Sequence, residues 1–423
     1  MADYTKMWEG LGLNLNRHDI LLEALGQIYG DVYMKQPNRP KGMEYFDFVI
    51  SEVHGLRIQE LMEHKLKGGK VVGTFCVYVP DEIITAGGGI SVGLCGGAQF
   101  SISDAEAILP HNLCPLIKSS VGFKMGRICP YFEVNDFLVG ETTCDGKKKT
   151  WEILNDYIPI YVMELPHKKG DASRELWLKE VVAFKNRMEE ESGVKITSEA
   201  LDAGIKLANS KRKALARLYE TRKNSSVPIS GKDSLLISQI AFYDDPIRFT
   251  SKVNELSAEL EDRVKNGIGV VESKLPRIMF SGCPMAIPNW KIPHIVETSG
   301  GIVVCEELCT GTRYFTNLVD ESQKELDGQL KAIAERYLSI NCSCFTPNEE
   351  RIDQILQLAK DYKVSGIIYY VLQFCHTYNV EYEKVKKALA KAKIPVLKLE
   401  SDYGEGDTGQ LKTRIETFLE QIR

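Results

Sequence analysis

The stretch KVVGTFCVYVPDEIITAGGGISVGLCGG, residues 70–97, predicts the fold of this chain. Residues 71–75 form a short apolar run rich in β-branched side chains, which is typical of a buried strand. Pro80 and the two acids after it indicate a helix start, and three glycines end that helix before a second strand at 90–94. Cys76 and Cys95 each follow a strand. That is the sheet edge at which open α/β sheets place their ligands.

The same pattern occurs again about two hundred residues later. Residues 277–311 read RIMFSGCPMAIPNWKIPHIVETSGGIVVCEELCTG, a strand ending at Cys283, a proline, a helix, a glycine pair and a strand ending before Cys309. The similarity continues in both halves, because Cys114 precedes a strand that ends at Cys144, and Cys342 precedes a strand that ends near Cys375. The sequence therefore predicts two Rossmann-like, doubly wound parallel-sheet domains related by an internal repeat.

Segments of helical periodicity surround these two units. The predicted division is a helical cap at 1–69, a first α/β domain at 70–170, a charge-rich helical insert or linker at 171–266 and a second α/β domain at 267–423. In the cap, helical spacing covers residues 19–29 and 45–66. In the insert, Gly193 is expected to end one helix and Ser198 to cap the next.

Composition narrows the functional classes. The chain has 423 residues, 43% hydrophobic and 26% charged, with a net charge of −5 and no basic block of the kind that binds nucleic acid. No apolar run is long enough to span a bilayer, and the N-terminus lacks a signal-peptide pattern. We therefore expect a cytoplasmic protein without membrane or nucleic-acid partners. Its 11 cysteines are then expected to be buried thiols, catalytic thiols or metal ligands rather than disulfides.

Several kinds of thiol chemistry are open. A structural zinc site is disfavoured because the chain has no C-x-x-C pair, and the local ferredoxin pattern is absent. A catalytic thiol would need a histidine base, for which His111 and His376 are candidates. Cysteines separated by tens to hundreds of residues instead favour an iron–sulfur cluster held between domains.

Eight motifs carry a resemblance to a known family. They are GTFCVYVPDEII, LPHNLCPLIKSSVGF, VGETTCDGKKKTWEIL, RIMFSGCP, EELCTGTRYF, RYLSINCSC, YYVLQFCHTYNVE and GQLKTRIETFLEQI. The chain resembles the 2-hydroxyacyl-CoA dehydratase superfamily over residues 70–423, and within it the double-cubane cluster proteins. The segment 1–67 fits the family less distinctively.

The resemblance implies a set of cluster ligands. In the dehydratases three cysteines hold one [4Fe–4S] cluster, and these match Cys76, Cys114 and Cys375. Exchanging the two repeat units gives a second triple, Cys283, Cys342 and Cys144. Two such triples would hold an [8Fe–9S] double-cubane cluster, and Cys309 or Cys344 could replace Cys283 or Cys342. Cys95, Cys129 and Cys305 are interpreted as packing residues.

The implied activity is low-potential reduction of small molecules such as acetylene, azide or hydrazine. A separate ATP-hydrolysing iron–sulfur reductase would supply the electrons, in agreement with the lack of an ATP-binding loop in this chain, and the protein would be a homodimer. The candidate proton donors, chosen by nearness in sequence to the cysteines, are Glu141, His111, His376 and Glu82.

Two alternatives stay open. The chain could be a 2-hydroxyacyl-CoA dehydratase subunit with a single [4Fe–4S] cluster, in which Lys118, Ser119 and Ser120 or Lys147–Lys149 contact phosphates. It could also carry clusters only to pass electrons to another protein.

Overall fold

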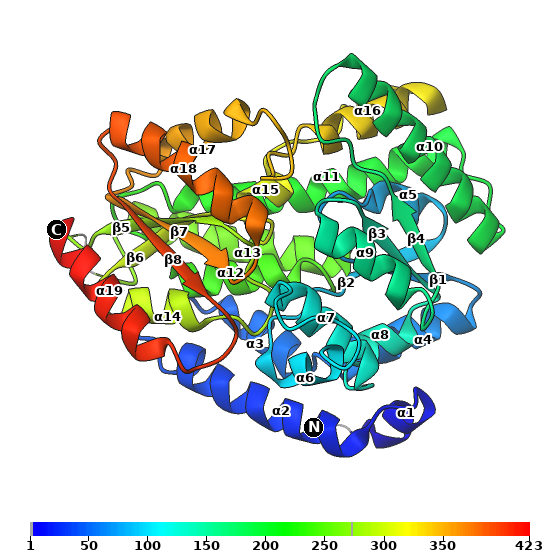
Figure 1. Ribbon diagram of the computed structural model, residues 1–423, viewed down its shortest axis with the longest axis horizontal. Coiled ribbons are helices and arrows are strands. Elements are labelled where there is room, and N and C mark those ends of the chain that lie inside the picture. The colour runs from blue at the N-terminus through cyan, green and yellow to red at the C-terminus, as the bar shows by residue number, and fades with distance from the viewer. Residues whose placement is uncertain (1–2, 272–273) are drawn as a thin grey trace.

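The computed structural model describes residues 3–271 and 274–423 and contains two parallel sheets of four strands each (Figure 1). The first sheet has the order β2-β1-β3-β4 and the second the order β6-β5-β7-β8, so the two sheets share one topology. The predicted fold class and the internal repeat are thereby confirmed. The strands are β1 (Lys70–Thr74), β2 (Gly89–Gly93), β3 (Phe137–Glu141), β4 (Ile160–Met163), β5 (Arg277–Gly282), β6 (Ile302–Glu307), β7 (Gly366–Leu372) and β8 (Val396–Ser401).

The inner strands are apolar because helices cover both faces of each sheet. Every residue of β3 and of β7 is buried, and β1 pairs with β3 through Val72 opposite Phe137. The helices of the two units are α5 (Asp81–Ala86), α6 (Ile102–Ala105), α7 (Pro115–Met125), α8 (Pro130–Val134), α9 (Asp145–Leu154), α14 (Lys291–Thr298), α15 (Thr312–Phe315), α16 (Leu326–Leu338), α17 (Glu349–Asp361), α18 (His376–Lys391) and α19 (Thr408–Gln421).

The N-terminal segment is helical, with one difference from the prediction. The helical spacing at 45–66 is not one helix, because the chain turns at residues 52–55. Gly55 permits this turn: a Cβ there would lie 2.3 Å from the Tyr4 ring. The helices are α1 (Thr5–Gly10), α2 (Leu15–Tyr29), α3 (Met43–Ser51) and α4 (Leu56–Leu66).

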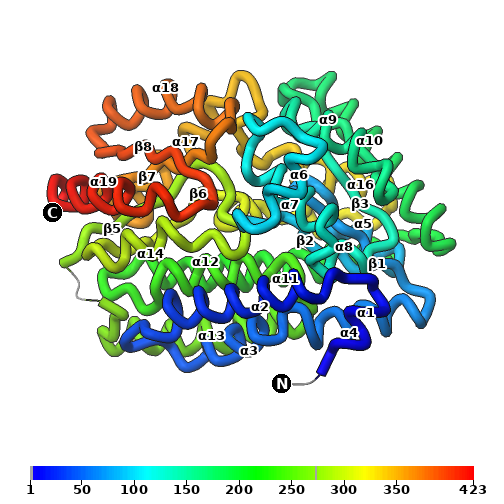
Figure 2. The backbone as a smooth tube through the Cα atoms, turned by 60° about the horizontal axis from the view of Figure 1, so that its bottom comes forward, coloured from blue at the N-terminus to red at the C-terminus, as the bar shows by residue number. Residues whose placement is uncertain are grey.

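Four further helices connect the two sheets in the chain, namely α10 (Asp171–Ser192), α11 (Ser198–Thr221), α12 (Gly231–Ile240) and α13 (Pro246–Lys265). Gly193 ends α10 with a φ of 69°, as predicted. The predicted cap of α11 was wrong by one residue, since Thr197 rather than Ser198 accepts the Ala200 N–H. Figure 2 shows α2, α3, α12 and α13 in one layer on the same side of the sheets. No helix in the described ranges is long and apolar enough to cross a membrane.

A buried ionic cluster joins the two units through α11. Arg212 of α11 donates to Glu82 Oε1 of α5 at 2.7 Å and to the Tyr337 hydroxyl of α16 at 3.0 Å. The Tyr337 hydroxyl in turn donates to Glu82 Oε2 at 2.8 Å. At most 1% of each of the three residues is exposed, so no water screens this contact.

Replacing Arg212 with methionine should therefore destabilise the protein by about 3–5 kcal/mol, because Glu82 would stay buried without its partner. The double variant Glu82→Leu/Arg212→Met should lose clearly less. Urea unfolding followed by circular dichroism measures both. Equal losses in the two variants would show that packing, not the uncompensated charge, is what Arg212 contributes.

Candidate functional site

Cysteines follow the strands at equivalent places in the two sheets. Cys144 and Cys375 each lie three residues past the end of β3 or β7, and each caps the next helix, α9 or α18. Cys95 and Cys309 each lie two residues past β2 or β6. Because the carboxyl ends of parallel strands meet at one edge, this repeat directs thiols of both units to the space between them.

The first thiol group consists of Cys114, Cys283 and Cys375. The Cys375 thiol interacts directly with the thiols of both Cys114 and Cys283, and its charge also helps to raise the pKa of Cys144, after burial. The Leu372 N–H donates to Cys283 Sγ at 3.3 Å, and the Thr377 hydroxyl lies 3.8 Å from Cys375 Sγ. Cys114 comes from the first unit and the other two members from the second, so the group spans the interface.

The second thiol group consists of Cys76, Cys309, Cys342 and Cys344. Cys76 interacts with Cys309, Cys342 interacts with Cys344, and the charges of Cys309 and Cys342 influence each other. The Tyr378 hydroxyl lies 3.6 Å from Cys342 Sγ. This group also spans the interface, since Cys76 belongs to the first unit.

This grouping differs from the triples expected from the sequence. Cys114 does lie with Cys375, but Cys283 takes the place expected for Cys76, and Cys76 lies instead with Cys342. Cys309, expected only as a substitute, interacts directly with Cys76.

Two buried cations lie near the second thiol group, Lys147 beside Cys76 and Arg313 beside Cys309. Lys147 forms an ion pair with Glu141, and its ammonium also lies 3.4 Å from the Phe75 carbonyl oxygen. Arg313 donates to Glu307 Oε2 at 2.9 Å and to Cys309 Sγ at 3.7 Å. The contact with Cys76, and then Arg313, lowers the pKa of Cys309.

The donor set suits a cluster better than a single ion. In the described residues, no three His, Cys, Asp or Glu side chains are arranged to hold one metal ion. A single zinc ion needs all its donors about 2.0–2.3 Å from one point, whereas an iron–sulfur cluster distributes its thiolates over several irons. Two groups of thiols across an interface fit that second requirement.

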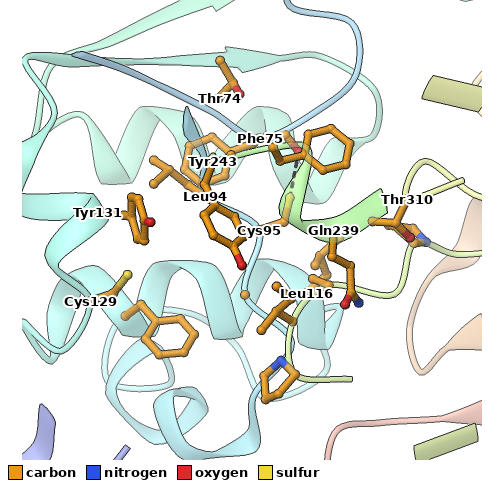
Figure 3. A pocket seen from close by; sticks show the side chains of 18 of the residues that line it. Thr74, Phe75, Leu94, Cys95, Leu116, Cys129, Tyr131, Gln239, Tyr243 and Thr310 are labelled. Atoms are coloured by element: carbon orange, nitrogen blue, oxygen red, sulfur yellow. Dashed lines mark hydrogen bonds between the residues drawn. The ribbon is translucent and has the colours of Figure 1, made fainter. Parts of the chain in front are cut away.

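A cavity of about 190 Å³ adjoins the second thiol group (Figure 3). Cys76, Cys95 and Cys309 line it together with mostly apolar side chains, including Leu94, Leu116, Phe123 and Phe242. An apolar cavity of about 150 Å³ is enough for benzene. This cavity therefore accommodates a small molecule next to the thiols.

Two tyrosines, Tyr131 and Tyr243, contribute to the cavity wall. Tyr131 and Tyr243 are 5% and 6% exposed, and their rings lie 5.6 Å apart. Neither hydroxyl has a hydrogen-bond partner among the described residues. Both are therefore free to bond a polar group of a molecule in the cavity.

The predicted proton donors occupy different environments. Glu141 is fully buried, and burial raises its pKa although Lys147 opposes the shift. Glu82 is fully buried in the ionic cluster with Arg212. His111 is 85% exposed and lies 3.0 Å from Glu106, and His376 is exposed at the start of α18.

The predicted phosphate contacts are all engaged within the chain. Lys118 donates to Glu106 and to the His111 carbonyl, while Ser119 and Ser120 accept backbone N–H groups of the loop at 96–98. Of the lysine triplet, Lys147 binds Glu141, Lys148 binds Asp145 and Lys149 binds Glu152.

Sequence reasoning missed several cavity residues. Tyr131, Tyr243 and His54 line the cavity, and Cys95, interpreted as a packing residue, lies in its wall and donates to the Phe75 carbonyl at 2.9 Å. Of these four cavity residues, only Cys95 could have been found from the sequence, through its position after a strand. Tyr131, Tyr243 and His54 come from helices and turns that carry no motif.

Two α/β units with thiols gathered between them define the class of this protein, and comparison with known sequences identifies the family. The sequence profile described as "2-hydroxyglutaryl-CoA dehydratase, D-component" matches residues 76–422. The chain belongs to this family.

Named relatives extend over nearly the whole chain. It is 38% identical to the "Putative dehydratase subunit YjiM" of Escherichia coli K12, over 88% of this chain and 97% of that protein. It is 23% identical to the (R)-phenyllactyl-CoA dehydratase beta subunit of Clostridium sporogenes, over 86% and 94%. It is 20% identical to a benzoyl-CoA reductase subunit of Thauera aromatica, over 84% and 91%. The relatives thus include both dehydratase and reductase subunits, which supports an enzymatic role.

The buried pair of Lys147 and Glu141 generates a pH-dependent prediction. Without Lys147, burial would favour the protonated form of Glu141, so its folded pKa would lie above its unfolded pKa. The stability of Lys147→Met should therefore fall, relative to the unaltered protein, as pH rises from 5 to 8, by up to about 1.4 kcal/mol per pH unit. The total loss should reach about 3–5 kcal/mol.

Chemical unfolding at several pH values measures this change. Lys148→Met is the matched control, because Lys148 pairs with an exposed Asp145 and should change little at any pH. A loss in Lys147→Met that is independent of pH would contradict the role given to Glu141.

Proposed function

We propose that this chain binds an [8Fe–9S] double-cubane cluster and reduces small molecules such as acetylene, azide or hydrazine. The observation that carries the proposal is the convergence of two thiol groups, each with members from both units, beside a cavity of about 190 Å³. The similarity to double-cubane cluster proteins supports the cofactor. When bound, the cluster would supply electrons at low potential.

The proposed ligands are Cys76, Cys114, Cys144, Cys283, Cys342 and Cys375, and Cys309 or Cys344 could replace Cys283 or Cys342. Buried thiols resist ionisation, and burial together with the interaction with Cys375 raises the pKa of Cys283. Metal binding displaces such thiol protons. Lys147 and Arg313 lie close enough to offset part of the resulting negative charge.

The cavity supports a small substrate. Its mostly apolar wall suits uncharged molecules such as acetylene and hydrazine. The lysines and serines considered for acyl-CoA phosphates are held by other groups of the chain.

The partners follow from the resemblance. We propose a homodimer that receives electrons from a separate ATP-hydrolysing iron–sulfur reductase.

The second candidate function is a 2-hydroxyacyl-CoA dehydratase subunit with one [4Fe–4S] cluster. The names of the relatives favour it, since the Escherichia coli relative at 38% identity is a putative dehydratase subunit. The two functions differ in cofactor size, and this makes them separable.

Iron and acid-labile sulfide per chain, measured on anaerobically purified protein, distinguish the candidates. About eight irons with slightly more sulfide are expected for the double cubane, and about four irons for the single cluster. Protein with zinc and no sulfide would contradict both.

Single cysteine variants test the ligands in the same assay. Cys375→Ser, Cys342→Ser and Cys144→Ala should each lose iron without unfolding. Cys305→Ser is the control, because Cys305 is a buried thiol in β6 that is not among the proposed ligands. Full iron content in Cys144→Ala would remove that residue from the ligand set and contradict the triple of Cys283, Cys342 and Cys144.

The tyrosine hydroxyls generate a prediction on selectivity. The double variant Tyr131→Phe/Tyr243→Phe should raise the KM for hydrazine about tenfold, since a hydrogen bond in a buried site contributes about 0.5–1.5 kcal/mol. The KM for acetylene, which forms no comparable hydrogen bond, should stay unchanged and serves as the control. Equal changes for both substrates would indicate altered cavity shape instead.

A further inference from the structure

Two buried histidines connect the cavity with the protein surface. His54, in the turn between α3 and α4, lines the cavity and is 7% exposed. Its Nδ1 lies 3.0 Å from Nε2 of His18 in α2, and His18 is fully buried. On its other side, Nδ1 of His18 lies 3.9 Å from the carboxylate of Asp19, whose side chain is 69% exposed.

The two nitrogens outside the shared contact lie at the two ends of this pair. Nδ1 of His18 has no hydrogen-bond partner among the described residues. At the other end, Nε2 of His54 lies 3.9 Å from Cys129 Sγ, beside the cavity. Each ring thus has one nitrogen in the shared contact; the other nitrogen of His18 is buried beside the exposed Asp19 carboxylate, and the other nitrogen of His54 lies beside the cavity.

The surroundings hold both rings in this orientation. The Trp8 indole lies 4.3 Å from the His18 ring, and its N–H donates to the His54 carbonyl at 2.7 Å. The His54 ring lies 6.0 Å from that of Tyr131. Burial lowers the pKa of His18 to about 4 and that of His54 well below its usual value. Neutral imidazoles in contact can pass a proton from one nitrogen to the other without storing charge.

We propose that His18 and His54 form a proton relay from solvent to the cavity, which rests on the reductive function proposed above. A proton bound at Nδ1 of His18 allows the proton on Nε2 to pass to Nδ1 of His54. The proton on Nε2 of His54 is then released into the cavity. Each ring must return to its first tautomer before another proton passes.

The relay supplies the protons that a reduction in this mostly apolar cavity requires. Conversion of acetylene to ethylene takes two electrons and two protons, breaks one π bond and forms two C–H bonds. The electrons come from the separate reductase. The protons come from solvent at Asp19, through His18 and His54.

Acetylene reduction by the holoprotein, with Ti(III) citrate as the electron donor, tests the relay. His54→Ala and His18→Gln should each lower turnover about 10²-fold, the usual contribution of a positioned proton donor. Iron content and the rate at which Ti(III) reduces the cluster should not change. Added imidazole should restore a large part of the turnover of His54→Ala, because it can occupy the space left by the ring.

His64→Ala is the control, since His64 lies in α4, the helix that follows His54, but contacts the Gly88 carbonyl away from the cavity. If His54→Ala loses iron, His54→Gln takes its place in the comparison with His18→Gln. Full turnover in these variants, or a loss that imidazole does not reverse in iron-replete His54→Ala, would overturn the relay. Failure of the unaltered protein to bind iron or reduce acetylene would overturn the proposed function, and the relay with it.

Discussion

The site depends on holding two α/β units in one fixed relation. Neither thiol group is complete within one unit, because Cys114 meets Cys283 and Cys375, and Cys76 meets Cys309, only across the interface. A small rotation of one unit would separate these sulfur atoms. The buried contact of Arg212 with Glu82 and Tyr337, from three different parts of the chain, resists such a rotation. In this way α11 determines whether the thiols can act together.

Local chemistry made much of this architecture predictable. Short β-branched runs, prolines at helix starts and glycines at helix ends act within a few residues, and they indicated the strands and the repeat. The position of cysteines after strands was equally local, so the convergence of thiols could be expected from parallel-sheet geometry. Gly193 is an example: a glycine after a helical segment predicted the end of α10, where its φ is 69°.

The grouping of the thiols could not be predicted, because it depends on how the two units face each other. Internal symmetry relates Cys76 to Cys283 but does not say which of them lies beside Cys114. The same limit applies to the cavity. Tyr131 and Tyr243 lie more than a hundred residues apart, and their meeting results from packing between the first unit and the turn after α12 rather than from any motif.

The repeat is symmetric in topology but not in its surroundings. Cys95 and Cys309 follow equivalent strands, yet Cys95 bonds the Phe75 carbonyl while Cys309 receives a hydrogen bond from Arg313. The cavity wall includes Cys76 and Cys309 and also, from the N-terminal helical segment, Leu21 and Leu25 of α2 and His54 of the turn between α3 and α4. Those helices have no counterpart in the repeat, so they place the mostly apolar cavity on one side of an otherwise two-fold arrangement. A symmetric pair of sheets can gather the sulfur atoms, but the N-terminal helices decide where a molecule and a proton can approach them.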